Sequence, residues 1–242
     1  MAHRGYARDG CENSMAAFDR AVAMGYRYLE TDVQVTSDGV ALAFHDARLD
    51  RVTDCRGRVS EMPWSVVRSA RIRGREPIPR LDELLDAWPQ TRINLDIKAK
   101  AGVTPVLEAI TRTAAIDRVC IASFSGARLR AVRARVGPRL CTALTPREVL
   151  ALRLALVRGH AARLPANAAC AQVPSHIGRR RFVDRRFIAA AHRSQVAVHV
   201  WTVNDPAEMH RLLDLGVDGL ITDEAELLRD ILAARAQWGD EV

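Results

Sequence analysis

The chain has 242 residues, of which 48% are hydrophobic and 27% are charged, and its formal net charge is +7. This composition is that of an ordinary globular protein and excludes a disordered or membrane-embedded chain. Only Lys98 and Lys100 among the 36 basic residues are lysines. Such an arginine bias is typical of GC-rich coding, so we expect no nucleic-acid partner. The length suits one large core, and we expect residues 1–242 to form a single domain.

Five widely spaced cysteines contain no CxxC pair, which argues against a disulfide scaffold and against a thiolate zinc site. No run is long and apolar enough to span a bilayer, and polar residues of interest begin at residue 3, which leaves no room for a signal peptide. We therefore expect a cytoplasmic protein without a stable membrane anchor.

Short β-rich runs alternate with amphipathic stretches along the whole chain. We predict strands at residues 1–4, 28–33, 93–98, 119–124, 140–144, 170–173, 196–203 and 219–222. We predict helices at residues 14–24, 81–88, 104–114, 126–136, 146–157, 184–193, 206–215 and 224–236. This alternation favours an α/β fold, a TIM (β/α)8 barrel, over an open sheet. No GxGxxG or P-loop motif follows any strand, which removes the main support for a nucleotide site.

The second predicted strand carries two acids on one face. Glu30 and Asp32 share that face because strand side chains alternate. A hairpin signal, Asp-Gly at residues 38 and 39, follows and leads to His45. With a two-residue loop, Asp32 lies opposite His45. We expect residues of about 36–79 to form an insertion after the second strand, over the end of a barrel where active sites lie.

The third predicted strand adds further polar residues to the same place. Asn94, Asp96 and Lys98 share one face of that strand. Asp96 with Glu30 and Asp32 would complete an oxygen cage for one divalent cation, Mg²⁺ or Ca²⁺. The alternative is structural, because Asp96 and Lys98 could form a buried ion pair that merely closes the core.

Several motifs together resemble the glycerophosphodiester phosphodiesterase family. They are HRG at 3–5, ENS at 12–14, LETDV with TSDG and FHD at 29–46, IPRLDELL at 78–85, LDIK at 95–98, WTVN at 201–204 and GVDGLITD at 216–223. They follow the family's order over essentially the whole chain. The resemblance implies a TIM barrel with an insertion after the second strand. Family members carry several apolar residues before HRG, so either the natural start lies upstream or the first strand is a stub that leaves a gap in the barrel wall beside His3. They usually have Glu where Asp96 stands, so we expect a shorter third ligand.

The resemblance also implies roles for individual residues. His3 and His45 would act as acid and base, and Glu30, Asp32 and Asp96 would hold the metal. Arg4 and Lys98 would contact the phosphate. Trp201 and Asn204 would line the wall of the substrate site, although Trp201 could equally be a core aromatic. Gln172 is a weaker candidate for a polar contact, and Asp223 could serve only as a helix cap.

The function implied is metal-dependent hydrolysis of a small glycerophosphodiester to an alcohol and sn-glycerol 3-phosphate. The first attack could come from a neighbouring glycerol hydroxyl or from water, and either histidine could be the acid. One alternative is a lysophospholipase D or sphingomyelinase D type reaction, for which apolar residues 62–67 of the insertion would supply a lipid-facing flap. Another is a phosphate-binding barrel without activity. The sequence leaves open the leaving alcohol, the choice of Mg²⁺ or Ca²⁺ and the number of subunits.

Overall fold

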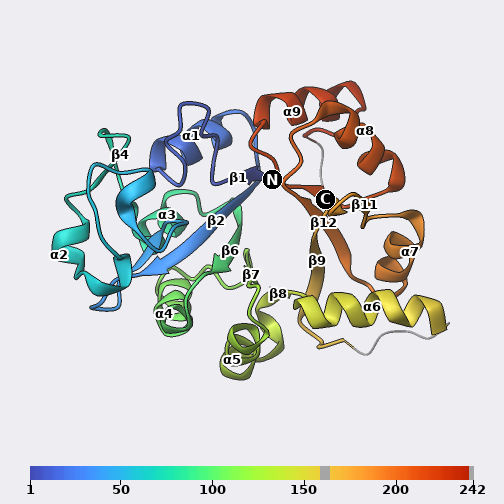
Figure 1. Ribbon diagram of the computed structural model, residues 1–242, viewed down its shortest axis with the longest axis horizontal. Coiled ribbons are helices and arrows are strands. Elements are labelled where there is room, and N and C mark those ends of the chain that lie inside the picture. The colour runs from blue at the N-terminus through green and yellow to red at the C-terminus, as the bar shows by residue number, and fades with distance from the viewer. Residues whose placement is uncertain (159–163, 240–242) are drawn as a thin grey trace.

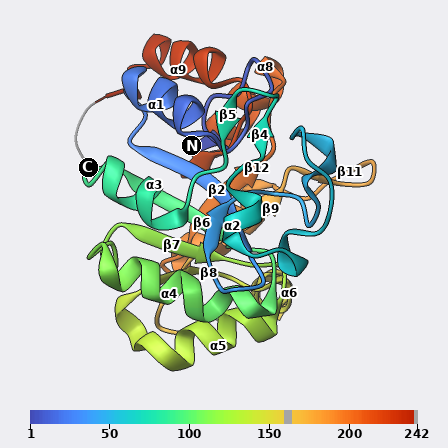
Figure 2. The ribbon, with the colours of Figure 1, turned by 90° about the vertical axis from the view of Figure 1, so that its left-hand side faces the viewer.

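The computed structural model describes residues 1–158 and 164–239. A curved parallel sheet is surrounded by helices, as Figures 1 and 2 show. Its strands follow the order β1-β2-β6-β7-β8-β9-β12-β13. They are β1 Ala2–His3, β2 Tyr28–Val35, β6 Arg92–Ile97, β7 Val119–Ala122, β8 Cys141–Ala143, β9 Ala168–Pro174, β12 Ala197–Trp201 and β13 Gly219–Leu220. The predicted eight-stranded TIM barrel is confirmed.

The helices that cover the sheet lie where their periodicity predicts them. They are α1 Met15–Ala23, α3 Leu81–Ala87, α4 Val103–Arg112, α5 Gly126–Val136, α6 Pro146–Arg158, α7 Arg185–Arg193, α8 Pro206–Leu215 and α9 Ala225–Ala234. Side-chain caps fix several of their starts: Ser14, Asp184 and Asp205 each accept a hydrogen bond from the backbone N–H three residues on. Such caps satisfy backbone donors that have no partner within the helix.

The first strand is as short as expected, yet it closes the ring. Ala2 pairs with Leu29 of β2 on one side and forms a bridge to Thr222 on the other. His3 N–H donates to the Thr222 carbonyl at 3.0 Å, and Thr222 N–H donates to the Met1 carbonyl at 3.2 Å. Ala2 is completely buried. The gap expected beside the first strand is therefore absent, because both edges of β1 are paired.

The segment after β2 folds over the end of the barrel. It contains β3 Ala41–Ala43, the 3₁₀ helices η1 Leu49–Arg51 and η2 Val59–Glu61, the short helix α2 Trp64–Val67, and the hairpin of β4 Arg71–Ile72 with β5 Glu76–Pro77. It has a small apolar cluster of its own, in which Leu42, Phe44 and Ile72 are fully or almost fully buried. The cluster holds this segment as a packed unit on the barrel.

The hairpin between β2 and β3 has a different register from the one predicted. Val35 pairs with Ala41, and Thr36 N–H donates to the Val40 carbonyl, so the loop has three residues. Gly39 adopts φ +87°, a conformation that favours glycine and suits such a loop. Phe44 N–H consequently donates to the Asp32 carbonyl. The predicted placement of His45 opposite Asp32 is wrong by one residue.

The remaining secondary elements are small. They are the hairpin of β10 His176–Ile177 with β11 Arg180–Arg181 and the 3₁₀ helices η3 Lys100–Gly102 and η4 Gly137–Arg139. The main core lies between the sheet and the helices. Leu29 and Val33 of β2 and Leu95 of β6 point into it and are fully buried. Their strand neighbours of opposite parity point into the barrel, which places the acidic side chains there.

Candidate active site

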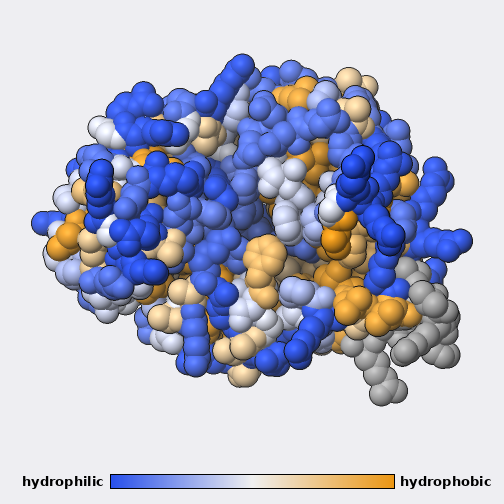
Figure 3. Space-filling view, in the orientation of Figure 1, coloured by the Kyte–Doolittle hydropathy of each residue, from blue (hydrophilic) through white to orange (hydrophobic). Residues whose placement is uncertain are grey.

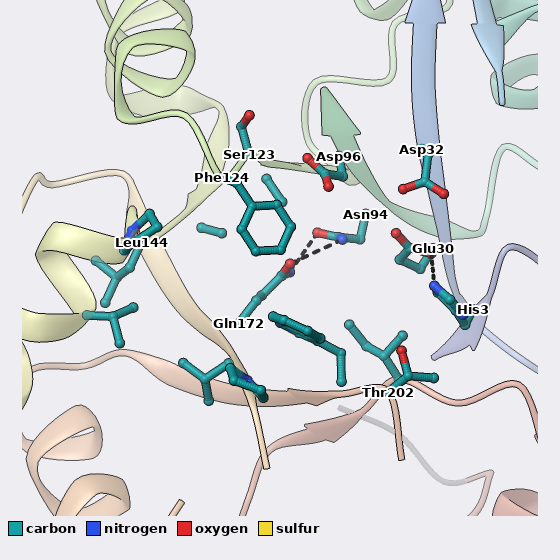
Figure 4. Close-up of a pocket in the computed structure, with 18 of the residues that line it drawn as sticks. His3, Glu30, Asp32, Asn94, Asp96, Ser123, Phe124, Leu144, Gln172 and Thr202 are labelled. Atoms are coloured by element: carbon teal, nitrogen blue, oxygen red, sulfur yellow. Dashed lines mark hydrogen bonds and ion pairs between the residues drawn. The ribbon is translucent and has the colours of Figure 1, made fainter. Parts of the chain in front are cut away.

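A cavity of about 580 Å³ opens at the carboxyl ends of the barrel strands (Figure 4). His3 comes from β1, Glu30 and Asp32 from β2, and Asn94 and Asp96 from β6. The parallel register pairs Glu30 with Asn94 and Asp32 with Asp96. Two adjacent strands thus bring three carboxylates to one wall.

These three carboxylates are almost completely buried, with relative exposures of 6% for Glu30, 2% for Asp32 and 7% for Asp96. Burial, and then the negative charge of Asp32, raise the pKa of Glu30 to about 7. Burial also raises the pKa of Asp96. Burial and mutual repulsion both disfavour the ionised carboxylates, and a cation placed beside them relieves both effects.

Two cations already face the cluster. Lys98 Nζ lies 2.7 Å from Asp32 Oδ1 and 2.6 Å from Asp96 Oδ2. Burial lowers the pKa of Lys98, but Asp32 and Asp96 outweigh that effect and raise it, so the ammonium stays charged. Arg4 Nε lies 3.0 Å from Asp32 Oδ2, and the backbone N–H of Arg4 donates to Glu30 Oε2. The sequence alternative of an Asp96–Lys98 ion pair is present, but it belongs to a larger cluster that faces the cavity.

Two buried oxygens of the cluster lack a hydrogen-bond partner in the described chain. They are Asp32 Oδ2, whose Arg4 neighbour is close but poorly aligned, and Asp96 Oδ1. Within the described residues no three His, Cys, Asp or Glu side chains already form a metal-ligating group. The orphaned oxygens and the all-carboxylate donor set nevertheless fit a hard divalent cation, since such ions prefer oxygen ligands and burial without a partner is costly.

His3 is oriented by a residue from the far end of the chain. Its Nδ1 lies 2.6 Å from Asp223 Oδ1, and its Nε2 lies 3.8 Å from Glu30 Oε2. Burial lowers the pKa of His3, but the hydrogen bond to Asp223 and the charge of Glu30 raise it overall. Asn204 Nδ2 donates to the other Asp223 oxygen at 2.8 Å. The expectation that Asp223 caps a helix is wrong: the N-cap of α9 is Glu224, and both Asp223 oxygens bind side chains, one of them the His3 ring.

His45 has a matching carboxylate partner in the insertion. Its Nδ1 lies 2.6 Å from Asp46 Oδ1. Arg51 binds Asp46 through two nitrogens and holds the pKa of that carboxyl down at about 2. Arg51 also binds Glu12, and Glu12 in turn accepts from Arg4. This chain of charge-assisted contacts connects the insertion to the first barrel loop.

Trp201, Asn204 and Gln172, the remaining predicted site residues, differ in whether they line the cavity. Trp201 lines the cavity and meets Phe124 edge-on, with ring centroids 5.7 Å apart. Asn204 contacts Asp223 and Thr222 and is absent from the cavity lining in the described chain. Gln172 also lines the cavity and donates to Asn94 Oδ1 at 2.7 Å across the barrel, as Figure 4 shows.

Sequence reasoning missed the supporting roles of three residues, Asp223, Asp46 and Arg51. Asp223 was considered only as a cap, because the contact to His3 spans 220 residues and depends on closure of the barrel. Arg51 binds both Asp46 and Glu12. Asp46 belongs to the FHD motif and Glu12 to the ENS motif, but no sequence signal pointed to Arg51. Both histidines therefore have a carboxylate on Nδ1, which leaves Nε2 for the cavity.

The glycerophosphoryl diester phosphodiesterase family model matches residues 3–227 of the chain. A Mycobacterium tuberculosis protein named "Probable glycerophosphodiester phosphodiesterase 2" is 40% identical over 242 residues, which cover 98% of this chain and 92% of that protein. The crystal structure of a putative glycerophosphoryl diester phosphodiesterase from Silicibacter pomeroyi has a TM-score of 0.81 at 24% identity, covering 97% of this chain and 92% of the other. A phosphodiesterase from Oleispira antarctica, solved with the product sn-glycerol-3-phosphate, has a TM-score of 0.80 at 21% identity, covering 96% and 95%. With a family match over nearly its whole length and a relative at 40% identity, the chain belongs to the glycerophosphodiester phosphodiesterase family.

Proposed function

We propose that the protein hydrolyses glycerophosphodiesters to an alcohol and sn-glycerol 3-phosphate. One observation carries this proposal. His3 and His45 each have a carboxylate on Nδ1, and both line the cavity that holds the buried cluster of three acids and two cations. A phosphodiester anion needs charge neutralisation, an activated nucleophile and a proton for the leaving alkoxide. The product bound to the Oleispira antarctica structure is consistent with this chemistry.

Glu30, Asp32 and Asp96 would hold one divalent cation, Mg²⁺ or Ca²⁺. When bound there, the cation supplies Lewis-acid stabilisation of charge on a phosphate oxygen. Lys98 and Arg4 reach the same carboxylates and are placed to donate charge-assisted hydrogen bonds to the phosphate. The phosphate would therefore lie above the wall formed by β2 and β6.

His3 and His45 would share the proton transfers. One imidazole takes the proton of the attacking oxygen, which belongs either to the neighbouring glycerol hydroxyl or to water, and the other protonates the leaving alcohol. Asp223 and Asp46 fix which ring nitrogen of each histidine carries hydrogen, because a carboxylate on Nδ1 accepts from it. Trp201 would line the substrate wall, and Asn204 would act on the site through Asp223.

The proposed setting is a single catalytic domain, residues 1–242, with residues of about 36–79 as an insertion over the site. All five cysteines are free, which suits the reducing cytoplasm. In the described chain, helices fall short of the length and apolarity needed to cross a membrane. The expected partner is the small-molecule substrate, with no nucleic acid and no stable membrane anchor.

The test is turnover of glycerophosphocholine and glycerophosphoethanolamine by the purified chain. Activity should disappear with EDTA and return with Mg²⁺ or Ca²⁺. Inactivity on both substrates and on a lysophospholipid, with either metal, would contradict the proposal and favour a barrel that only binds phosphate.

A further inference from the structure

The cavity has a second end that the chemistry above does not use. Beyond the acids, its wall is apolar and comes from the β7–α5 loop, the β8–α6 loop, α6, and the β10–β11 hairpin with the residue that follows it; the side chains are Phe124, Leu144, Val149, Leu150, Ile177 and Phe182. Figure 4 shows Leu144 on the side of the cavity opposite Asp32 and Glu30. One continuous cavity thus joins a charged end to an apolar end.

Much of this apolar wall is exposed to water. Within the described chain, the large apolar side chains that are exposed are Tyr28, Val66, Phe124, Leu150, Leu154 and Ile177. Phe124 is 63% exposed, Ile177 59% and Leu150 57%, and all three line the cavity. Leu154 lies about one turn further along α6. Figure 3 shows hydrophobic surface beside the central hollow, over the region of α6. Exposed apolar side chains that gather in a concave wall indicate a binding site.

Phe124 lies where the two ends of the cavity meet. Its ring centroid is 5.9 Å from Lys98 Nζ, and the ring packs edge-on against Trp201. The pair of Phe124 and Trp201 therefore has Lys98, which would hold the phosphate, on one side. The apolar wall begins on the other side of this pair. A ligand that spans both ends would carry its anionic group on the Lys98 side and a hydrocarbon group on the Leu150 side.

The insertion does not supply this apolar surface. Of residues 36–79, all of which the structure describes, only His45 lines the cavity. Val67 is fully buried within the insertion's own cluster, and Met62 and Trp64 pack against that cluster. The lipid-facing flap considered for residues 62–67 is thus not where a lipid would bind, and the apolar wall lies on the α6 side of the barrel.

We propose that this end of the cavity takes a hydrocarbon chain, so that the preferred substrates are phosphodiesters with one long acyl chain. The inference rests on the proposed phosphodiesterase function and names the substrate class of that site. Glycerophosphocholine has no group that would cover Leu150 and Ile177, whereas a single acyl chain would remove both from water. The acyl chain could be attached to the glycerol or to the leaving alcohol, and in both cases the same hydrocarbon would contact this wall.

The test measures turnover and binding in parallel. Substrates are glycerophosphocholine, lysophosphatidylcholine with the chain on the glycerol, and glycerophospho-N-acylethanolamine with the chain on the leaving alcohol, all below their micelle-forming concentrations. We expect kcat/KM to rise with chain length in at least one of the two chain-bearing series. Binding of the same compounds to His45→Ala protein, measured by calorimetry, should show the same dependence on chain length.

Two variants of the apolar wall and one matched control test whether the acyl chain of the substrate binds there. Leu150→Gln and Ile177→Gln should each lower the ratio of kcat/KM for the long-chain substrate to that for glycerophosphocholine by about tenfold or more. Val66→Gln, in the similarly exposed Val66 on α2, should leave this ratio unchanged.

Equal kcat/KM and equal affinity for glycerophosphocholine and the chain-bearing compounds would overturn the inference and leave the phosphodiesterase proposal standing. A ratio that the two wall variants do not change would also overturn it. Chain-dependent binding without hydrolysis of any diester would support the apolar site and contradict the proposed reaction instead.

Discussion

At the scale of single residues, Asp223 is the contact that most affects His3. It approaches His3 Nδ1 to 2.6 Å and is itself held by Asn204. Burial would raise the pKa of Asp223, but the hydrogen bonds from His3 and Asn204 lower it, so the group is a carboxylate at neutral pH. A carboxylate here fixes the imidazole tautomer and favours its protonated form.

Replacement of Asp223 by Asn should lower the pKa of His3. Burial, which acts in that direction, would then be opposed only by Glu30. The His3 imidazole would lose its proton at a lower pH than in the wild type. NMR titration of the His3 ring in both proteins measures the shift directly, with His192 as an exposed internal reference. An unchanged or raised pKa would show that Asp223 does not stabilise the protonated ring.

The roles of these residues were only partly readable from the sequence. Glu30, Asp32 and Asp96 could be grouped because strand alternation and the neighbouring positions of β2 and β6 follow from local patterns. The contact between His3 and Asp223 could not be found in this way, because it requires the first and last strands to meet. Asn204 was placed correctly near the end of β12, but its hydrogen-bond partners depend on the same closure.

At the scale of elements, one arginine of the insertion connects His45 to the first barrel loop. Arg51 of η1 binds Asp46, the partner of His45, and also Glu12 of the first barrel loop. Glu12 is mostly buried, and although burial raises its pKa, Arg51 and Arg4 lower it overall. This arginine therefore orients His45 through Asp46, while the β2–β3 pairing and the hydrogen bond from Gln34 to the His45 carbonyl hold the backbone beside it.

Replacement of Arg51 by Ala should lower kcat by about tenfold or more, as expected when an orienting partner is removed. The effect on KM should be smaller, because Arg51 does not line the cavity in the described chain. Arg48→Ala is the matched control, since Arg48 is adjacent to η1 and similarly exposed, but its ion-pair partner among the described residues is Asp50 and not Asp46 or Glu12. Similar losses in both variants would contradict a specific role for Arg51.

The elements themselves were largely predictable, and the register of one hairpin was not. Helix α5 falls on its predicted range, residues 126–136, because Ser125 caps its start and Gly137, at φ +66°, ends it. The Asp-Gly pair indicated the turn between β2 and β3 correctly. A three-residue loop with Gly39 at positive φ uses the same residue types as a two-residue loop, so the pairing shifted by one.

At the scale of the whole molecule, the barrel concentrates negative charge in its interior although the chain is basic overall. Glu30, Asp32 and Asp96 face the positive charges of Lys98 and Arg4 on the cavity side. A ligand that binds the folded barrel and not the unfolded chain stabilises the fold by mass action. The proposed cation should therefore be visible in the stability of the protein as well as in its activity.

Saturating Mg²⁺ or Ca²⁺ should raise the free energy of unfolding by about 2.7 kcal/mol at a concentration one hundred times the dissociation constant. Thermal unfolding with EDTA and with each metal measures this effect. Asp96→Asn should abolish most of the response, because it removes one of the three proposed ligands. A metal-dependent shift of the same size in Asp96→Asn protein would place the cation elsewhere.

The central claim is that two histidines catalyse hydrolysis of a glycerophosphodiester, and ³¹P NMR of the reaction mixture tests it most directly. With glycerophosphocholine and a divalent cation, the wild-type chain should form sn-glycerol 3-phosphate, with or without a transient cyclic phosphate. His45→Ala should be slower by about 10²- to 10⁴-fold, the usual contribution of a general acid or base. Formation of sn-glycerol 3-phosphate at a nearly normal rate by the His45→Ala protein would contradict the account.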